Sequence, residues 1–492
     1  MKKLNYTTLQ ELGYTGFLQK EGKNKVLQFG EGNFLRAFVD NFIDVLNEKC
    51  DFNAKVIVTQ PIEAGLAPMI NEQEGLYTLY LRGMEDGKQV NNKRVISCIS
   101  HCINPYSEYQ SLLDCAKEDD LRYIVSNTTE AGITFDDSCK FDDAPPSSFP
   151  AKLTRFLYER FTLGKKGFVI LSCELIDNNG KELLNCVDKY IELWKLSDEF
   201  KNFVHEENLF CSTLVDRIAT GYPRKEVEEL NKENGYEDNL IDTAEVFGFW
   251  VIEGPESLKE ELPFEKAGLP VLITDDHTPY KKRKVRILNG AHTSMIMAAY
   301  LGGKDIVREC MEDEVIRNFM DTTLQNEIIP TLDLSKEELE SFANAVIDRF
   351  NNPYIDHELL SISLNSTAKW KARVMPTLTA YVNNFNTLPT NVVFSFASYI
   401  AFYRGTKFEN GALTGKRNSD EYKISDDAWI IEWYGEKIGM ANKELVNAVC
   451  TNEKMWGTDL TKLNGFEARV CEYLDLIDEK GMYEAIKEVN GR

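Results

Sequence analysis

The sequence predicts an α/β protein, with a doubly wound parallel sheet in its N-terminal part and a mostly helical C-terminal part. Through the first half of the chain, short apolar segments rich in β-branched residues alternate with helical patterns, as in repeated βαβ units. After about residue 280, helical patterns dominate. A chain of 492 residues is also too long for one compact core. We therefore expect two domains, residues 1–280 and residues 281–492.

The first βαβ unit contains a turn with two glycines. NKVLQFG is a short apolar strand, NFLRAFVDNFIDVLNEK follows with aromatic residues at helical spacing, and AKVIVTQP is a second strand. LRYIVSNTTEAGI and KGFVILSCELIDNNG provide two further strands. Ligands bind at the carboxyl ends of the strands in such sheets. The loops at residues 30–34, 126–130 and 173–179 are therefore candidate ligand sites.

Five segments of the C-terminal part show helical patterns. They are VRILNGAHTSMIMAAYLGG, VIRNFMDTTLQNEIIPTL, KEELESFANAVIDRFNN, PTNVVFSFASYIAFYRG and KELVNAVCTNEKMWG. No internal repeat, low-complexity segment or flexible linker separates them from the first domain, so the boundary near Lys281 depends on the change of pattern alone.

The turn GEGNF matches two of the three glycines in the G-x-G-x-x-G fingerprint that binds a pyrophosphate. Gly30 and Gly32 take the first two positions and Leu35 takes the third. The acidic residue expected at the end of the second strand is also missing, because that strand runs into TQP. Its place between a strand and a helix favours a Rossmann-like dinucleotide site; the alternative is an ordinary strand-to-helix connection. The residues expected to contact the cofactor are Phe29, Gly30, Glu31, Gly32, Asn33, Phe34, Asn127 and Thr128.

The formal net charge of −23 argues against nucleic acid and anionic membranes as partners, because both require a basic face. No segment approaches the roughly 18 apolar residues of a membrane span, and the N-terminus lacks the apolar segment of a secretory signal. An anionic cofactor would have to be held by backbone amides and by the N-terminal end of the helix near Asn33. Arg36 either adds a positive charge there or is a surface residue.

Eleven cysteines without a regular spacing indicate a reduced, cytoplasmic protein. Cys98, His101 and Cys102 in CISHC resemble half of a metal site, but no partner pair is visible. The segment RVISCISHCI is apolar and rich in β-formers, so we interpret it as a buried strand and expect no metal.

Lys284, Asn289 and His292 in KVRILNGAH could perform carbonyl reduction without a metal. This reaction needs a general acid/base, a donor for the developing oxyanion and groups that position the substrate. Neighbouring cations favour a lowered pKa for the lysine. In a regular helix, Lys284 and His292 would lie about 80° apart and about 12 Å along the axis. The alternative is a solvated basic patch followed by a structural histidine.

These motifs together resemble the mannitol dehydrogenase family of long-chain, metal-independent polyol dehydrogenases. The family carries a G-x-G-N-F turn and a lysine–asparagine–histidine signature at spacings of five and three, and QEGLYTL, TEAG, LSCE, VDRI and RFNNPYI match in order along the chain. The resemblance implies a nicotinamide cofactor, NAD, and a lysine acid/base, with the asparagine and histidine holding the reacting oxygen. It also implies substrate contacts from Asp216 and Lys369.

Within the family, longer blocks such as IVSNTTEAG, CSTLVDRIATGYPR and KWKARVMPTL resemble members that interconvert D-altronate and D-tagaturonate. Residues that differ from mannitol-type members, including Leu175, Ser361 and Asn365, argue against mannitol as the substrate. Arg373, with Lys371 nearby, suits the carboxylate of a small sugar acid; the alternative is that both are solvated helix charges.

Three questions stay open at this level. The substrate is either the tagaturonate–altronate pair or the fructuronate–mannonate pair, whose epimers differ only in the direction of a hydroxyl. A catalytically silent sugar-acid or nucleotide sensor on the same fold is the alternative from another class, although binding alone does not need an acid/base. NAD is expected over NADP, with Glu63 close enough to repel a 2′-phosphate. The oligomeric state is not indicated.

Overall fold

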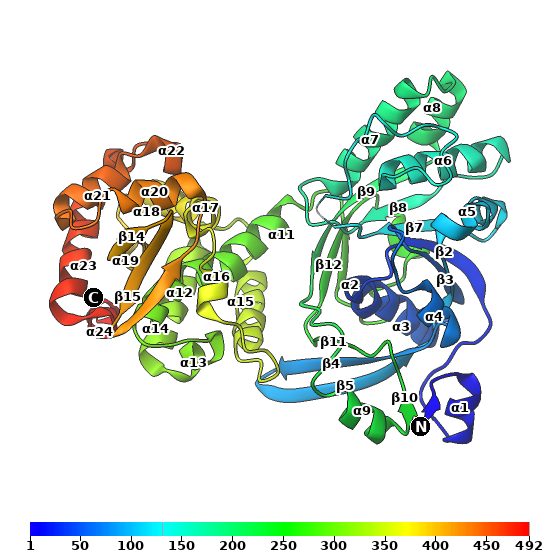
Figure 1. Ribbon diagram of the computed structural model, residues 1–492, viewed down its shortest axis with the longest axis horizontal. Coiled ribbons are helices and arrows are strands. Elements are labelled where there is room, and N and C mark those ends of the chain that lie inside the picture. The colour runs from blue at the N-terminus through cyan, green and yellow to red at the C-terminus, as the bar shows by residue number, and fades with distance from the viewer. Residues whose placement is uncertain (130, 492) are drawn as a thin grey trace. The chain divides into compact units, whose positions relative to one another are not determined.

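The computed structural model describes residues 1–129 and 131–491 (Figure 1). Glu130, which belongs to one predicted ligand loop, lies outside the described residues. The chain divides into two compact units. Unit 1 contains Met1–Arg82 and Val90–His277, and unit 2 contains Gly83–Gln89 and the chain from Thr278 onward. Each unit is described by itself below.

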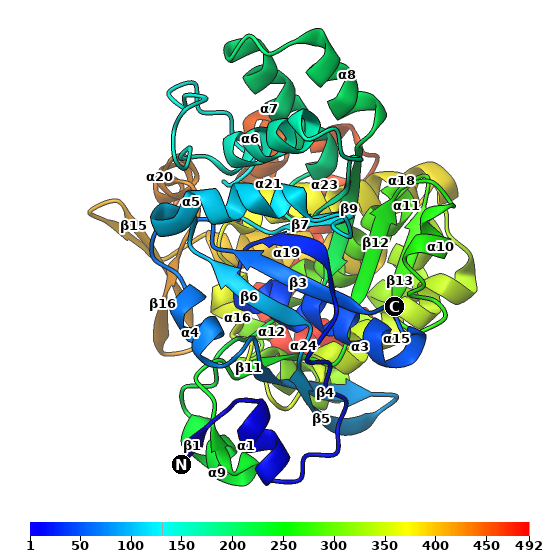
Figure 2. The same ribbon diagram turned by 90° about the vertical axis from the view of Figure 1, so that its right-hand side faces the viewer.

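The main sheet of unit 1 has eight strands in the order β13-β12-β9-β8-β7-β2-β3-β6. The strands from β6 to β9 pair in parallel, whereas β12 is antiparallel to β9 and parallel to β13. Figure 2 shows this sheet with its strands side by side. The predicted doubly wound α/β fold is therefore confirmed. The strands are β2 (Lys23–Phe29), β3 (Ala54–Thr59), β6 (Ile99–Ile103), β7 (Tyr123–Ser126), β8 (Val169–Ser172), β9 (Leu209–Asp216), β12 (Phe249–Glu253) and β13 (Val271–Thr274).

Alternating side chains of the strands fill two hydrophobic cores, one on each face of the sheet. Val26 and Val56 belong to one core, and their neighbours Leu27 and Ile57 belong to the other. This period of two explains why these strands are apolar throughout, since a parallel strand covered on both faces buries every side chain. The first core includes α2 (Asn33–Leu35), η1 (Arg36–Asp40), α3 (Asn41–Cys50) and α4 (Ala67–Glu72). The second includes α5 (Pro105–Asp114), α6 (Phe149–Thr162), α7 (Asn179–Leu193) and α8 (Asp198–Glu206).

The strand order places a switch point between β2 and β7. The chain builds β2, β3 and β6 outward in one direction and then returns to build β7, β8 and β9 in the other. The resulting order corresponds to the 3-2-1-4-5-6 order of dinucleotide-binding folds. Ligands of such sheets bind where this order reverses, outside the carboxyl ends of the strands. The loops that follow β2 and β7, at residues 30–32 and 127 onward, leave the sheet at this point.

A second sheet of unit 1 was not predicted. It contains β11 (Asp242–Glu245), β4 (Tyr77–Glu85) and β5 (Lys88–Ile96) in that order, and the tip of the β4–β5 hairpin, Gly83–Gln89, belongs to unit 2. The predicted strand RVISCISHCI is two strands in the structure, because β5 ends at Ile96 and β6 begins at Ile99. Unit 1 also contains β1 (Lys2–Lys3) paired with β10 (Tyr236–Glu237), and the helices α1 (Tyr6–Glu11), α9 (Val227–Asn234) and α10 (Leu258–Glu261).

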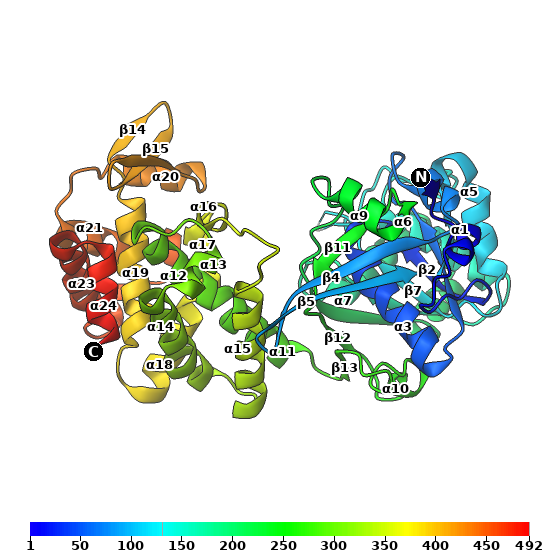
Figure 3. The same ribbon diagram turned by 90° about the horizontal axis from the view of Figure 1, so that it is seen from below.

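Unit 2 is mostly helical, as predicted, and is organised around α19 (Thr390–Tyr403). Every residue from Asn391 to Tyr403 is buried, as expected for a helix that is apolar on all sides. It packs against α12 (Ala291–Leu301), α23 (Phe466–Lys480) and α24 (Met482–Asn490) (Figure 3). The other helices include α14 (Glu314–Thr322), α15 (Lys336–Phe350), α17 (Ser366–Arg373), α18 (Met375–Phe385), α20 (Ala428–Gly435) and α21 (Asn442–Cys450). A small sheet of β14 (Lys407–Glu409), β15 (Ala412–Arg417) and β16 (Asp420–Ile424) was not expected.

No helix within residues 1–129 and 131–491 is both long and apolar enough to cross a bilayer.

All eleven cysteines are free thiols. Cys102 lies on β6, Cys98 directly precedes that strand, and both are buried. The His101 ring contacts the Ser100 hydroxyl at 2.9 Å. Across the described part of the chain, no three His, Cys, Asp or Glu side chains come together in a way that could hold a metal ion.

Candidate active site

The two glycines of the GEGNF turn have different structural roles. Gly30 follows β2 with a φ of 125°, a conformation that favours glycine, and a β-carbon there would lie 3.0 Å from the carbonyl oxygen of Asn127. Gly32 has an ordinary φ of −69°, and a β-carbon there would have no atom within 4 Å. Gly30 therefore allows the turn to pack against the loop after β7, whereas Gly32 borders open space. Leu35, in place of the third glycine, is buried in the core beneath the turn.

Two buried side chains hold the carbonyl groups of this turn. Gln28 Nε2 donates to the carbonyl oxygen of Gly30 at 3.0 Å, and Arg36 Nε donates to that of Glu31 at 3.2 Å. In a trans peptide, the N–H of the next residue points opposite to the carbonyl. The amides of Glu31 and Gly32 therefore point away from those two side chains, and the Glu31 amide faces its own carboxylate. With the helix that begins at Asn33, the Gly32 amide forms an arrangement that suits an anion, and the space beside Gly32 can accept it.

Arg36 is 2% exposed, so the surface alternative for this residue is wrong. Its Nη2 donates to Asn33 Oδ1 at 2.6 Å and its Nη1 to the carbonyl oxygen of Leu240 at 2.7 Å. It also lies 3.8 Å from Asp242 and 5.1 Å from the centre of the Tyr77 ring. All three guanidinium nitrogens thus donate within unit 1, and Arg36 stabilises the turn from behind.

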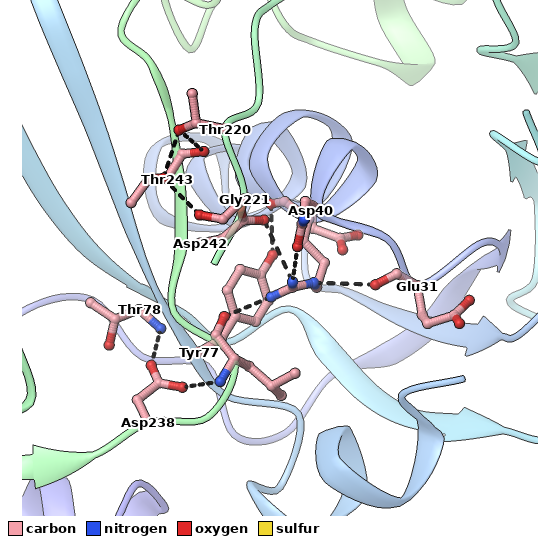
Figure 4. Close-up of polar contacts among 12 residues, drawn as sticks. Glu31, Asp40, Tyr77, Thr78, Thr220, Gly221, Asp238, Asp242 and Thr243 are labelled. Carbon is pink, nitrogen blue, oxygen red and sulfur yellow. Dashed lines mark hydrogen bonds and ion pairs between the residues drawn. The ribbon is translucent and has the colours of Figure 1, made fainter. Parts of the chain in front are cut away.

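Buried carboxyl groups surround this arginine. Burial raises the pKa of Asp40 and of Asp242 to about 7 each, against the effect of the Arg36 charge. Asp238, farther along the same network, accepts the N–H of Thr78 at 2.7 Å, and Tyr77 donates its hydroxyl to the carbonyl oxygen of Arg36 at 2.7 Å (Figure 4). The acids beside Arg36 therefore balance its positive charge above about neutral pH and lose that effect as they take up protons below it.

The loops after β7 and β8 are tied together at the same edge of the sheet. Glu174 is buried, and its carboxylate accepts the N–H and the hydroxyl of Thr128, both at 3.1 Å, and the Ser126 hydroxyl at 3.2 Å. Asn127 Nδ2 donates to the carbonyl oxygen of Cys173 at 2.7 Å. Burial raises the pKa of Glu174. The structure thus brings Asn127 and Thr128 next to the glycine turn, and adds Glu174 and Gln28 as supporting residues that sequence reasoning missed.

The two predicted phenylalanines contribute differently. Phe29 is fully buried and packs against Phe149, so only its backbone borders the turn, through a hydrogen bond from the Asn127 N–H to its carbonyl oxygen at 3.1 Å. Phe34 is half-buried and stacks on Phe38 at 5.1 Å. Their proposed contact with a cofactor stays a prediction.

Lys284 and Asn289 lie on a π-helical segment, η3 (Lys284–Gly290), between α11 (Thr278–Arg283) and α12. The segment from Lys284 to His292 is therefore not one regular α-helix. Hydrogen bonds in a π-helix join residues five apart, so Lys284 and Asn289 lie about one turn apart on the same face. In an α-helix the same spacing would separate them by about 140°. The wider helix therefore aligns two side chains whose spacing does not fit an α-helix.

His292, in the first turn of α12, is held among aromatic and basic side chains. Its ring stacks on Phe350 at 4.7 Å and meets the His357 ring edge-on at 5.2 Å. Its Nε2 is buried and has no hydrogen-bond partner among the described residues. Burial first, and then the neighbours His357, Arg373, Arg349 and Lys369, lower its pKa to about 3. The imidazole is therefore neutral at ordinary pH.

Lys369 and Arg373, both on α17, belong to the cations that act on His292. Lys369 Nζ donates to the carbonyl oxygen of Ile362 at 2.7 Å, and Arg373 Nη1 lies 3.5 Å from Thr293 Oγ1. Within the described chain, neither forms an ion pair with a carboxylate. Burial lowers the pKa of each of them. Gly290 allows this approach of the two helices, since a β-carbon there would lie 3.1 Å from the carbonyl oxygen of Arg373.

The remaining predicted and missed residues can also be placed. Lys371 extends to Gly457, where a β-carbon would lie 3.2 Å from its Nζ, so it is separated from Arg373 on the helix. Arg349 and His357 were missed, although both lie in or just after the RFNNPYI block. Asp216 ends β9 at the carboxyl edge of the sheet and is buried in unit 1. Its contact with substrate stays a prediction.

Two family models match the chain. The mannitol dehydrogenase Rossmann domain matches residues 24–266, and the mannitol dehydrogenase C-terminal domain matches residues 276–478. The chain is 45% identical over 489 residues to an altronate oxidoreductase from Yersinia enterocolitica, covering 97% of this chain and 99% of the relative. It is 47% identical over 474 residues to an altronate oxidoreductase from Escherichia coli, covering 94% and 96%.

Two solved structures have a similar fold. A D-sorbitol dehydrogenase in substrate-free form has a TM-score of 0.78 at 22% identity, covering 98% of this chain and 100% of the other. The ternary complex of Pseudomonas fluorescens mannitol 2-dehydrogenase with NAD and D-mannitol has a TM-score of 0.70 at 21% identity, covering all of both chains. At these identities the likeness supports the fold alone.

Proposed function

Because the chain belongs to the mannitol dehydrogenase family, we propose that it is an NAD-dependent oxidoreductase that interconverts D-altronate and D-tagaturonate. Relatives named altronate oxidoreductase match nearly the whole chain at 45% and 47% identity, which supports this substrate pair. The structural observation that carries the proposal is the arrangement in unit 2. There, Lys284 and Asn289 share one helix face, and a neutral His292 lies beside Lys369 and Arg373, which form no ion pair within the described chain.

The cofactor is assigned to the switch point of the main sheet. The backbone amide of Gly32 and the start of the helix at Asn33 would hold the pyrophosphate, beside the loop of Asn127 and Thr128. When bound, NADH supplies hydride to the ketone carbon, and NAD accepts it in the reverse direction. The open space at Gly32 fits this assignment, since a side chain at that position would fill it.

In the proposed mechanism, the residues of unit 2 transfer the proton and stabilise the charge on the substrate oxygen. As the ketone is reduced, its oxygen gathers negative charge and takes a proton from the Lys284 ammonium group. The Asn289 amide donates a hydrogen bond to that oxygen and stabilises the developing charge. His292 is neutral, so one ring nitrogen can donate and the other can accept from the substrate hydroxyls. In the oxidation of altronate, neutral Lys284 removes the hydroxyl proton.

The substrate carboxylate is assigned to Arg373, supported by Lys369. A guanidinium group presents a planar fork that pairs with both carboxylate oxygens. Neither cation forms an ion pair within the described chain, although the Asp426 charge acts on Lys369 from farther away. Both are partly removed from water, so a carboxylate would gain more there than at an exposed site. A neutral polyol such as mannitol has no group to pair with them, which favours a sugar acid.

We assign the protein to the cytoplasm. Eleven free thiols, most of them buried, suit a reducing compartment. Its proposed partner is a small-molecule sugar acid, and the net charge of −23 argues against nucleic acid.

The decisive experiment follows absorbance at the nicotinamide band with tagaturonate, fructuronate and fructose in parallel, each with NADH. We expect the highest kcat/KM with tagaturonate. A higher value with fructuronate would select the fructuronate–mannonate alternative, and a higher value with fructose would reject the role assigned to Arg373. Binding of NADH without turnover of any of the three would favour a sensor.

A further inference from the structure

The second strand of the nucleotide-binding unit, β3, ends without the acidic residue that usually recognises the adenosine ribose. In dinucleotide-binding folds that residue accepts a hydrogen bond from the ribose 2′-hydroxyl and repels the 2′-phosphate of NADP. Here Thr59 and Gln60 stand at the strand end. Gln60 turns its amide inward, donating to the carbonyl oxygens of Ile62 and Glu63 at 3.0 Å and 2.8 Å, while its Oε1 accepts the Ala67 N–H at 3.2 Å. Gln60 thus organises the loop after β3 but brings no charge to it.

A carboxylate reaches this same loop from the glycine turn. Glu31 is only 9% exposed, and the backbone amide groups of Leu66 and of Glu31 itself face its carboxylate. A β-carbon at Gly65 would lie 2.6 Å from Glu31 Oε1 and 2.7 Å from the side chain of Gln60. The absence of a side chain at Gly65 therefore makes room for the Glu31 carboxylate against the loop that follows β3.

From this placement we infer that Glu31 replaces the missing strand-end acid and determines the preference for NAD over NADP. The inference rests on the proposed use of a nicotinamide cofactor by unit 1. The carboxylate stands beside the end of the strand where the ribose of a dinucleotide lies, so it can accept a hydrogen bond from the ribose hydroxyl. A phosphate at the same position would meet a like charge in a partly desolvated place, where repulsion is strong.

The other acid of this loop is in a different situation. Glu63, which the sequence suggests as the repelling group, has an exposed side chain. The interaction of an exposed carboxylate with a phosphate is weakened by water and by salt. Because Glu63 lies on this loop, Glu31 packs against it and the two differ in burial, they form a matched pair of sites for substitution.

The test measures binding directly, by calorimetry of NADH and NADPH with the full chain. Glu31→Gln removes the charge, retains the shape and can still accept an amide N–H. We expect the ratio of the Kd for NADPH to the Kd for NADH to fall at least tenfold in Glu31→Gln. In the control, Glu63→Gln, the ratio should stay within about twofold of the parent value.

Each outcome decides a separate point. A ratio in Glu31→Gln that stays within twofold of the parent overturns the inference, as does a fall that appears in Glu63→Gln instead. A parent protein that binds neither nucleotide contradicts the proposed function itself. Circular dichroism of each variant establishes that the fold is retained, and Glu31→Ser provides a second charge-removing variant if Glu31→Gln does not fold.

Discussion

The glycine turn of unit 1 and the α17 face of unit 2 differ in where their positive charge lies. In unit 1, Arg36 is buried behind the turn, donates to the backbone carbonyl of Glu31 and is surrounded by Asp40 and Asp242. In unit 2, Lys369 and Arg373 form no ion pair in the described chain, and Asp426 acts on Lys369 only from a distance. The first arrangement presents oriented backbone dipoles, and the second presents cationic side chains.

This difference shows two ways in which a strongly acidic protein can bind an anion. Oriented amides act at short range and add no net charge, so they require a rigid backbone; in unit 1, buried side chains supply that rigidity. Cationic side chains act over a longer distance and distinguish a charged substrate from a neutral one. The proposed function uses the first for the cofactor, whose pyrophosphate is always present, and the second for the substrate, where charge distinguishes a sugar acid from a polyol.

The largest expected effect is a loss of turnover from a substitution in unit 2 that leaves cofactor binding by unit 1 intact. We predict that Lys284→Ala lowers kcat by about 10²–10⁴-fold, the range typical of a positioned acid/base. Binding of NADH, measured by calorimetry, should stay nearly unchanged. The control is Lys282→Ala, because Lys282 is exposed and pairs with Asp333 at 3.5 Å. Retention of more than about a tenth of the parent kcat in Lys284→Ala would exclude the acid/base role.

The next effect concerns the cations of α17. A hydrogen bond to a charged group contributes about 1.5–3 kcal/mol, so Arg373→Met should raise KM for tagaturonate by about 10- to 100-fold. Lys371→Met is the matched control, since Lys371 lies two residues away and extends to Gly457. Steady-state kinetics of both variants test the assignment. An equal rise in KM for Lys371→Met would mean that the overall positive charge of α17 attracts the substrate, and that Arg373 makes no specific contact with its carboxylate.

A third effect belongs to the turn of unit 1. Gly32→Val should weaken NADH binding at least about tenfold, because the branched side chain fills the space assigned to the pyrophosphate. The fold should persist, since the φ of Gly32 is −69°. Gly30→Val, in contrast, should lower the melting temperature, because its φ of 125° and the nearby Asn127 carbonyl do not accommodate a side chain. Unchanged NADH affinity in Gly32→Val would show that the turn only connects the strand to the helix and does not bind the pyrophosphate.

The smallest effect is a pH dependence from His292, whose pKa falls from 6.5 to about 3 in the folded protein. Between these values the unfolded chain takes up a proton that the native state does not, so the free energy of unfolding decreases as pH falls. The His292→Asn variant has no imidazole at this position, so its stability does not decrease with pH for this reason. The difference between the urea midpoints of the parent and the variant should therefore become smaller as the pH is lowered from 7 to 5. A deficit that stays constant or widens would show that His292 is protonated in the native state.

The sequence by itself determined the elements whose signal is local. The strands β2, β3, β7 and β8 are continuous apolar segments because both faces of a parallel sheet are covered, and the helix α19 is apolar on every side because it is central. The glycine turn and the lysine–asparagine–histidine spacing can also be recognised from the sequence, because their signal is local. Each is a short pattern that does not depend on residues far away in the chain.

Only the tertiary structure decided features that depend on distant partners. The strand β5 carries many polar residues, and the three-stranded sheet is completed only because β11 lies beside β4 from more than 150 residues later. The burial of Arg36 depends on Leu240 and Asp242, and the place of Glu31 depends on the glycine at residue 65. The π-helical turn that aligns Lys284 with Asn289 likewise gives no periodic signal in the sequence, since it lasts for only seven residues. The sequence shows which side chains can carry a charge, but the fold determines their neighbours and their exposure to water.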